Sequence, residues 1–173
     1  MVIGVMSDTH GHLALMHRVA NLMVHGLDVE IIFHLGDDFS DAQDLARHGY
    51  DVRMVPGLWC SEYNDGRIPK RIVETVDGVS IAAVHAEKDL RAIERAAEVV
   101  LAGHTHKAAV LPLGKALHLN PGHLSKNTRR GGKASFATLA IEPDVLRAAI
   151  HEVDGSVRAA VNVERGHSGK GTV

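Results

Sequence analysis

The stretch "VIGVMSDTHGH" (residues 2–12) decides how the fold begins, because it joins a strand signal to a group of chemically active side chains. Residues 2–6 are a continuous apolar run, which is typical of a short buried strand. Residues 13–26 then place apolar side chains at helical spacing, and "VEIIFHL" (29–35) predicts a second strand. The order strand, helix, strand indicates an α/β protein with a mostly parallel sheet.

The remaining sequence predicts further alternation, followed by a region of strands. Asp77-Gly78 lies between two alternating runs, and this dipeptide is a strong signal for a hairpin turn. The expected elements are a helix at 40–48, a strand at 51–55, a hairpin at 70–84, a helix at 88–97, a strand at 98–102, and mostly short strands over 107–161, including an antiparallel pair within 135–153. We expect one domain over residues 1–162 and a disordered, polar tail over 163–173.

Size and charge limit the range of functions. With 173 residues, 45% of them hydrophobic, the chain can bury the core of a single domain. Its formal net charge of -2 gives no electrostatic reason to expect nucleic acid or an anionic membrane as the main partner. Cys60 is the only cysteine, and the N-terminal apolar run reaches Asp8 too soon for a signal peptide or a membrane span. We therefore expect a cytoplasmic protein, with its oligomeric state left open.

Candidate metal ligands follow the carboxyl ends of five predicted strands. The segments are "SDTHGH" (7–12), "GDD" (36–38), "PGLWC" (56–60), "VHAE" (84–87) and "GHTH" (103–106). Each segment has an ordinary explanation by itself, such as a helix cap, a turn or a packed histidine. Because ligands of open α/β sheets bind at the carboxyl edge of the strands, the joint placement of these segments predicts one metal site.

The side chains in these segments indicate the chemistry of the site. The candidate ligands are Asp8, His10, Asp37, His85, His104 and His106. The two-residue spacing in the first and last segments would project both members of each pair to the same side of an extended segment. Mixed carboxylate and imidazole ligands suit Mn, Fe, Zn or Co. Asp37 is a natural bridge between two cations, and two metals about 3.5–4 Å apart favour phosphoester hydrolysis.

The other histidines are expected to have no part in metal binding. His34 lies on a predicted strand, where packing is the simpler explanation. His17, His25, His48, His118, His151 and His167 also belong to no strand-end segment.

The ordered series "SDTHGH", "LGDD", "VPG", "VHA" and "AGHTH" resembles the calcineurin-like metallophosphoesterases, and in particular their small compact phosphodiesterases from bacteria and archaea. The resemblance covers residues 1–141 and includes "LNPG" (119–122). It implies a sandwich of two mixed β-sheets flanked by helices, with two divalent transition metal ions at one end. It also implies that Asp8, His10 and His106 bind the first metal, that His85 and His104 bind the second, and that Asp37 bridges them.

The segment "PGLWC" departs from the family pattern. Family members have an asparagine ligand of the second metal after the glycine, whereas this chain has Leu58. Leucine has no lone pair, so the second site is expected to be weakened and only one ion tightly bound. Cys60 and Glu62 are candidate substitute ligands. Two arrangements stay open: Leu58 and Trp59 pack as a hydrophobic plug over the sheet with Cys60 inert, or they form an exposed apolar patch.

The resemblance implies a phosphodiesterase or phosphatase that uses a metal-bound hydroxide for in-line attack on a small phosphoester. His12 is close enough in sequence to reach the site, and Lys126, Arg129 and Arg130 are candidates for binding the phosphate. One alternative is a catalytically impaired metal-binding scaffold or partner-binding protein, as in a trafficking subunit of the eukaryotic retromer complex. Another is a metal-dependent enzyme with a different reaction.

Overall fold

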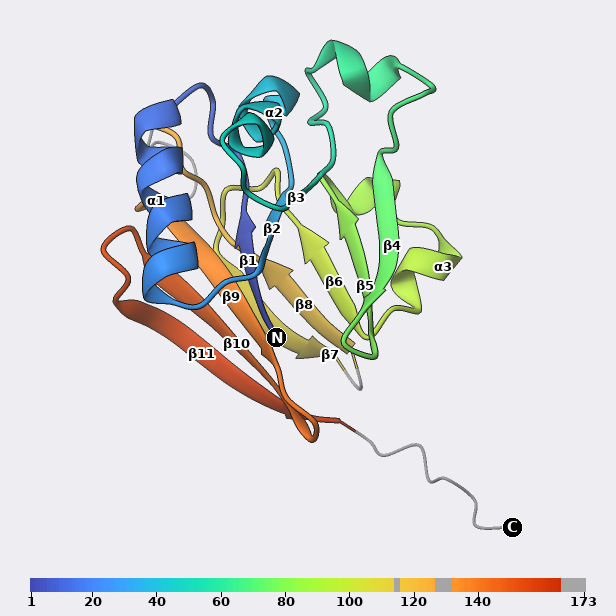
Figure 1. Ribbon diagram of the computed structural model, residues 1–173. Coiled ribbons are helices and arrows are strands. Elements are labelled where there is room, and N and C mark those ends of the chain that lie inside the picture. The colour runs from blue at the N-terminus through green and yellow to red at the C-terminus, as the bar shows by residue number, and fades with distance from the viewer. Residues whose placement is uncertain (114–115, 127–131, 166–173) are drawn as a thin grey trace.

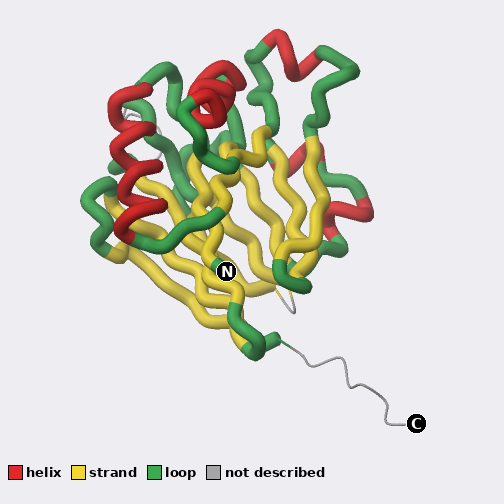
Figure 2. Tube along the Cα trace, viewed as in Figure 1, coloured by secondary structure: helices red, strands yellow, loops and turns green. Residues whose placement is uncertain are grey.

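The computed structural model describes residues 1–113, 116–126 and 132–165, which form two β-sheets with helices on the outside (Figure 1, Figure 2). Sheet A has the strand order β11 (Val157–Glu164), β10 (Val145–Glu152), β9 (Ser135–Ile141), β1 (Val2–Met6), β2 (Ile31–His34), β3 (Val52–Met54). Sheet B has the order β4 (Arg71–Val76), β5 (Val79–Val84), β6 (Val99–Ala102), β8 (Ala116–Asn120), β7 (Ala109–Leu113). The helical elements are α1 (Leu13–Gly26), α2 (Phe39–Arg47), α3 (Ala92–Arg95) and the 3-10 turns η1 (Ser61–Asn64) and η2 (Glu87–Asp89).

Both sheets are mixed. In sheet A the strands β1, β2 and β3 are parallel, while β9, β10 and β11 continue the sheet in antiparallel fashion. In sheet B the strands β5, β6 and β8 are parallel, and β4 and β7 are antiparallel edge strands. This architecture confirms the fold implied by the resemblance, a sandwich of two mixed sheets flanked by helices.

Alternation along the central strands builds two separate cores. Ile3 and Val5 of β1 contribute to the core between the sheets, together with Leu101 from sheet B. Met6 of β1 and Met16 of α1 belong to the second core, between sheet A and its helices. Successive side chains of a strand point to opposite faces, so one short strand serves both layers. A strand that is buried on both faces has a continuous apolar sequence, which is why residues 2–6 could be predicted as a strand.

The predicted helix at 88–97 is wrong. The segment instead contains η2, an extended turn at Leu90 and Arg91, and the four-residue helix α3. Leu90 is buried against β5 and β6, and Glu94 is buried beside Arg71, with 3.1 Å between Glu94 Oε1 and Arg71 Nε. These tertiary contacts override the helical periodicity of the segment.

The other expected elements are found close to their predicted bounds. The hairpin turns at Asp77-Gly78, both with positive φ, and residues 135–153 contain the antiparallel pair β9 and β10. The last strand, β11, runs to Glu164 and so includes the start of the segment assigned to a tail. Residues 166–173 lie outside the described part of the chain.

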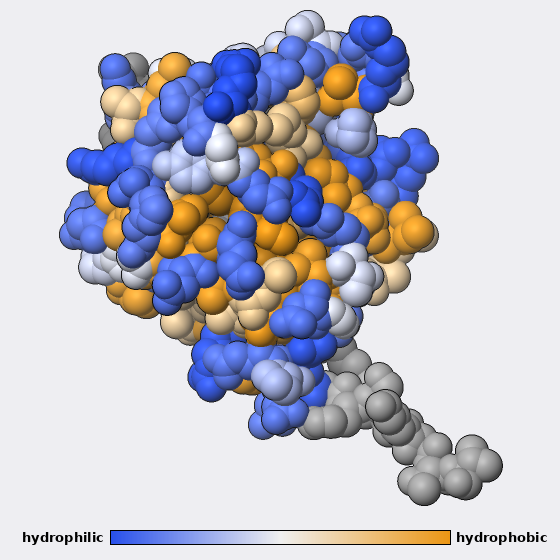
Figure 3. Space-filling view, in the orientation of Figure 1, coloured by the Kyte–Doolittle hydropathy of each residue, from blue (hydrophilic) through white to orange (hydrophobic). Residues whose placement is uncertain are grey.

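The two sheets also meet along one side. Arg53 Nε in β3 donates a hydrogen bond to Glu74 Oε2 in β4 (3.2 Å), which joins the edge strands of different sheets. Hydrophobic residues are visible across the middle of the same face in the space-filling view (Figure 3). Among the helices that the structure describes, none combines the length and the apolar character needed to span a membrane.

Candidate metal centre

The loops after β1, β2, β5 and β6 converge at the upper end of the sandwich in Figure 1. These strands are parallel within their sheets, so their carboxyl ends lie at the same edge. The loops carry the predicted ligands Asp8, His10, Asp37, His85, His104 and His106. The site is therefore assembled from both sheets.

Three of these residues, Asp8, His10 and His106, form one group of potential ligands, and Asp37 lies beside His10. His106 Nε2 lies 3.1 Å from Asp8 Oδ1 and 3.2 Å from His10 Nε2, and His10 Nε2 lies 3.5 Å from Asp37 Oδ2. Two imidazole nitrogens and one carboxylate oxygen thus face one another, with the Asp37 carboxylate next to them. This donor set is one that a divalent transition metal ion would satisfy.

A second group lies on the other side of Asp37. His85 Nδ1 donates to the carbonyl of Leu35 (2.7 Å), which leaves the lone pair on Nε2, 3.5 Å from Asp37 Oδ1. Both atoms are buried, and neither has a hydrogen-bond partner among the described residues. Buried polar atoms without partners are costly, so a cation between them fits the arrangement. The His104 ring packs edge-on against His85, with 5.1 Å between centroids.

The backbone of the site is held in an unusual conformation. Asp8, His10, His104 and His106 have φ values of 53°, 47°, 67° and 61°. The left-handed region costs about 1–2 kcal/mol for a residue with a Cβ atom, and such residues cluster at functional sites. The pairs therefore do not lie in extended segments, as the spacing argument assumed. Asp8, His10 and His106 share one group of potential ligands, whereas His104 belongs to no such group in the described chain and its ring instead packs against His85.

A chain of buried hydrogen bonds holds the first two loops together. The Gly36 amide donates to His34 Nδ1 (3.3 Å), His34 Nε2 lies 3.3 Å from Thr9 Oγ1, and Thr9 Oγ1 donates to Asp41 Oδ2 (2.6 Å). Asp41 Oδ2 also accepts from the Gly11 amide (2.9 Å). Burial lowers the pKa of His34 to about 4, so this histidine is neutral at pH 7. As expected, His34 is a packed residue, and its role here is to position the ligand loops.

The electrostatics of the site favour ligands in their metal-binding forms. Burial alone would raise the pKa of Asp8, but the hydrogen bond with His106 and the charge of His85 outweigh it and lower the pKa. Burial, together with the nearby His85, lowers the pKa of His104. A carboxylate and a neutral imidazole are the forms that bind metal.

The loop after β3 approaches Asp37 through its backbone. The Gly57 amide donates to the Asp37 carbonyl (3.1 Å), and the Cys60 thiol donates to the same oxygen. Cys60 Sγ also accepts a hydrogen bond from the Phe39 amide (3.3 Å). Burial raises the pKa of the Cys60 thiol, so the sulfur keeps its proton and serves as a loop anchor.

The predicted plug over the sheet is wrong for Trp59. This side chain is 86% exposed, whereas Leu58 is half-buried. Hydrogen bonds from Gly57 and Cys60 to the Asp37 carbonyl hold the loop on both sides of this exposed indole. Among the described residues, neither Cys60 nor Glu62 belongs to a potential ligand group, and Glu62 Oε2 accepts from Ser61 Oγ (3.1 Å).

The other candidate site residues have different positions. His12 precedes α1, and its Nδ1 donates to the carbonyl of Leu124 (3.1 Å). His12 belongs to no potential ligand group in the described chain. Lys126 is exposed, and Arg129 and Arg130 lie outside the described residues.

Sequence reasoning missed His123, which directly follows the "LNPG" motif. Its ring lies against that of His106, with 5.1 Å between centroids and 33° between planes. Its Nε2 donates to the Gly132 carbonyl (3.1 Å), and its Nδ1 accepts from Ser125 Oγ (3.1 Å). The fully buried ring restricts how His106 can turn. Its position after a family motif was the available signal.

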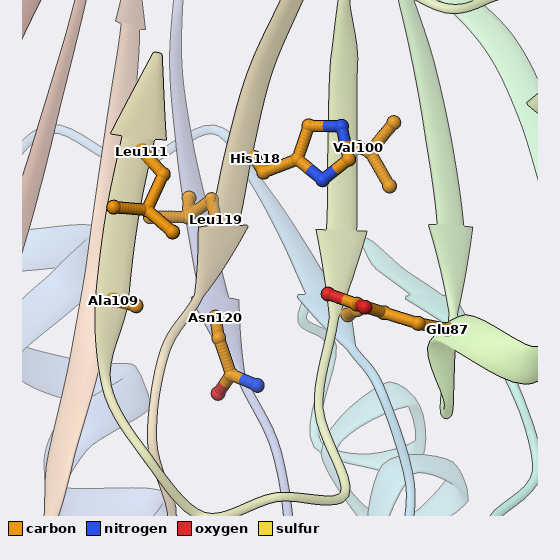
Figure 4. A pocket seen from close by; sticks show the side chains of 8 residues that line it. Glu87, Val100, Ala109, Leu111, His118, Leu119 and Asn120 are labelled. Atoms are coloured by element: carbon orange, nitrogen blue, oxygen red, sulfur yellow. The ribbon is translucent and has the colours of Figure 1, made fainter. Parts of the chain in front are cut away.

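Asn120, within the same motif, holds the last ligand loop. Its Nδ2 donates to the carbonyl of Gly103 (2.9 Å) and to Thr105 Oγ1 (3.1 Å), and its Oδ1 accepts from the Gly122 amide (3.0 Å). Figure 4 shows Asn120 at the end of β8, beside a small pocket that His118 and Glu87 also line. The "LNPG" motif therefore supports the site through loop geometry.

Gly57 generates a direct test of this geometry. A Cβ atom there would collide with Asp37 Oδ1 and with the Asp37 carbonyl. We expect Gly57→Ala to displace the carboxylate and weaken metal binding by about 10- to 100-fold, measured by titration with Mn(II) or Zn(II). Gly66→Ala is the control, because an added Cβ meets no described atom within 4 Å. Equal affinity in both variants would contradict the placement of Asp37 at the centre.

Comparison with known proteins identifies the family of this chain. Residues 1–144 match the family model for the calcineurin-like phosphoesterase superfamily domain. A probable metallophosphoesterase from Methanothermobacter thermautotrophicus is 28% identical over 179 residues, covering 95% of this chain and 100% of that protein. A phosphodiesterase from Methanocaldococcus jannaschii is 26% identical over 140 residues, covering 70% of this chain and 83% of that protein.

The fold is shared with a solved structure of Vacuolar Protein Sorting 29 from Cryptosporidium parvum. The TM-score is 0.71 at 16% identity, and the match covers 95% of this chain and 98% of that chain. This likeness concerns the fold alone. The family model, in contrast, spans most of the sequence and contains the converging ligand loops. The chain therefore belongs to the calcineurin-like phosphoesterase superfamily.

Proposed function

We propose that this protein is a metal-dependent phosphodiesterase that acts on a small phosphoester. The observation that carries the proposal is the position of Asp37, which directs Oδ2 towards His10 and Oδ1 towards His85. One carboxylate between two groups of nitrogen donors suits a pair of adjacent cations. The name of the M. jannaschii relative supports a phosphodiester as substrate.

The proposed ligand assignment is the one that the family resemblance implies. Asp8, His10 and His106, which form one potential ligand group, would hold one divalent ion. His85 and His104, whose rings are in contact, would hold the other, and Asp37 would be shared between them. Two such ions lower the pKa of water and stabilise the attacking and leaving oxygens of an in-line displacement at phosphorus. The protein lowers the pKa of Asp8, orients the imidazoles through Leu35 and His123, and restricts the ligand loops by hydrogen bonds.

The second ion is the weaker of the two in this proposal. Leu58 offers no lone pair, and the Cys60 thiol is used to anchor the loop. The second group therefore has fewer side-chain donors than the first. Mixed imidazole and carboxylate donors favour Mn, Fe, Zn or Co as the ions.

Replacing Asp37 tests the centre as a whole. We expect wild-type protein to bind Mn(II) or Zn(II) and to hydrolyse a generic phosphodiester, and Asp37→Ala to lose at least one metal equivalent and its activity. Asp38→Ala is the matched control, because this neighbouring carboxylate belongs to no potential ligand group in the described chain. Full metal content in Asp37→Ala, measured by elemental analysis, would refute the assignment.

Leu58 offers a gain-of-function test. Asparagine at this position would supply a carbonyl oxygen, so we expect Leu58→Asn to raise the affinity for the second metal equivalent and the turnover of the phosphodiester. Leu58→Ala serves as control, since it removes the same apolar bulk without adding a ligand. If Leu58→Asn and Leu58→Ala bind metal alike in calorimetric titration, Leu58 does not occupy the ligand position.

A second candidate function is partner binding, and the exposed Trp59 favours it. The indole is 86% exposed on a loop that contacts Asp37, and large exposed apolar groups mark interaction surfaces. The structural neighbour from C. parvum is named for vacuolar protein sorting and not for hydrolysis, which supports a non-catalytic role on this fold.

If Trp59 binds a partner, replacing it should reduce recovery of the partner complex, whereas replacing another exposed apolar residue should not. We expect cross-linked complexes recovered from source cells to be depleted for Trp59→Ala and retained for Ile93→Ala, which removes another exposed apolar side chain (67% exposed) from α3. Metal content should be equal in both variants. Equal recovery of every complex from the two variants would argue against this function.

A further inference from the structure

A second cluster of metal-binding side chains lies between α1 and α2. It consists of His17 from α1, Asp44 from α2 and His48, the residue that ends α2. We call it the helix cluster. It shares no residue with the centre at the strand ends. His17 and His48 fall in no strand-end segment, so their positions in the sequence predicted no metal role.

The donor atoms of the helix cluster are close together. His17 Nε2 lies 2.7 Å from Asp44 Oδ2, and His48 Nδ1 lies 3.6 Å from the same oxygen. All three residues offer a ligand atom within 4.8 Å of the others. In a tetrahedral site with bonds of about 2.0–2.1 Å, donors are about 3.3 Å apart. The His17–Asp44 contact is shorter than this value because it is a hydrogen bond, which a bound ion would replace.

The helical backbone explains how two of the donors meet. Asp44 and His48 are four residues apart at the end of α2, a spacing that puts side chains on the same face of a helix. His17 approaches from α1, next to Met16, which is buried in the core shared with sheet A. The core packing of α1 thus fixes the distance between His17 and α2.

Neighbouring groups orient the donors as outer-shell partners do in metal sites. Arg47 Nη2 donates to Asp44 Oδ1 (3.1 Å), which leaves Oδ2 directed at the histidines. His48 Nδ1 donates to the main-chain carbonyl of Asp44 (2.8 Å), which fixes the proton on Nδ1 and leaves the lone pair on Nε2. Metal-binding histidines commonly donate their other ring N–H to a backbone carbonyl.

The side chains of the helix cluster are partly exposed to solvent. The side chains of His17 and Asp44 are 28% and 21% exposed, and that of His48 is 58% exposed. A metal ion can therefore enter from solvent and keep a water molecule as its fourth ligand. The His17 and His48 rings pack edge-on, with 4.5 Å between centroids, so ligand binding needs only a turn of the exposed His48 ring that directs Nε2 at the ion.

We propose that the helix cluster binds a single Zn(II) ion that links α1 to the end of α2. Two imidazole nitrogens and one carboxylate oxygen form a borderline donor set that prefers zinc over magnesium or calcium. The ion is structural, since it ties together two helices that cover the same face of sheet A. The proposal does not depend on hydrolytic activity at the strand-end centre.

The test compares zinc stoichiometry in matched variants. Wild-type protein and the variants His17→Gln, His48→Gln and His25→Gln are dialysed against the same buffered zinc concentration and analysed for metal. We expect one zinc equivalent less in His17→Gln and His48→Gln than in the wild type. His25→Gln changes an exposed histidine at the end of α1 and should keep the full content.

Two further measurements separate this site from the strand-end centre and from misfolding. In an Asp37→Ala background, adding the His48→Gln substitution should still remove one zinc equivalent. At zinc concentrations about 100 times the Kd, the wild type should gain about 5 °C or more in Tm over His48→Gln, while the two should melt alike in EDTA. Equal zinc stoichiometry and equal zinc-induced shifts in wild type and His48→Gln would overturn the proposal.

Discussion

The packing of two mixed sheets against each other is the constraint on which the candidate centre depends. Ile3, Val5 and Phe33 from sheet A and Ile81 and Leu101 from sheet B fill the core between them without solvent exposure. Burial on this scale drives the association of the layers, because each apolar side chain removed from water contributes about 1.5–3 kcal/mol. With the sheets so packed, the carboxyl ends of β1, β2, β5 and β6 meet at one end of the molecule. Chemistry then becomes possible where neither sheet alone could supply enough donors.

The cost of this assembly is concentrated in the ligand loops. Carboxylate oxygens and imidazole lone pairs converge at Asp37, and several of these buried atoms have no hydrogen-bond partner within the described part of the chain. In addition, the ligand residues of the first and last loops adopt left-handed backbone conformations. Glycine at position 57 permits the close approach to Asp37, and the hydrogen bonds of His34 and Asn120 hold the loops in place. Strain of this kind persists only where the surroundings over-determine the conformation. A rigid scaffold around unsatisfied donors is what a metal centre requires before the ion arrives.

The loop after β3 is the segment that departs from the pattern implied by the family resemblance. Its backbone and the Cys60 thiol support the Asp37 carbonyl, while Leu58 and the exposed Trp59 are apolar. The loop therefore contributes to the architecture of the centre without adding a side-chain ligand among the described residues. The two proposed functions, hydrolysis with a weakened second ion and recognition of a partner, both rest on the residues of this loop.

Much of the fold was determined locally by the sequence. The apolar run at 2–6, the helix at 13–26 and the turn at Asp77-Gly78 have near-neighbour signals, and the ordered motifs identified the family and the residues that converge. Contacts between distant segments decided the rest. Leu90 and Glu94 broke the predicted helix by packing against sheet B, Trp59 was left exposed by anchors on either side, and His123 came to lie against His106. His17 and His48 met at Asp44 only because the core of sheet A holds α1 beside α2. Periodicity and turn chemistry act over a few residues, whereas these positions depend on burial and on free energies shared across the whole fold.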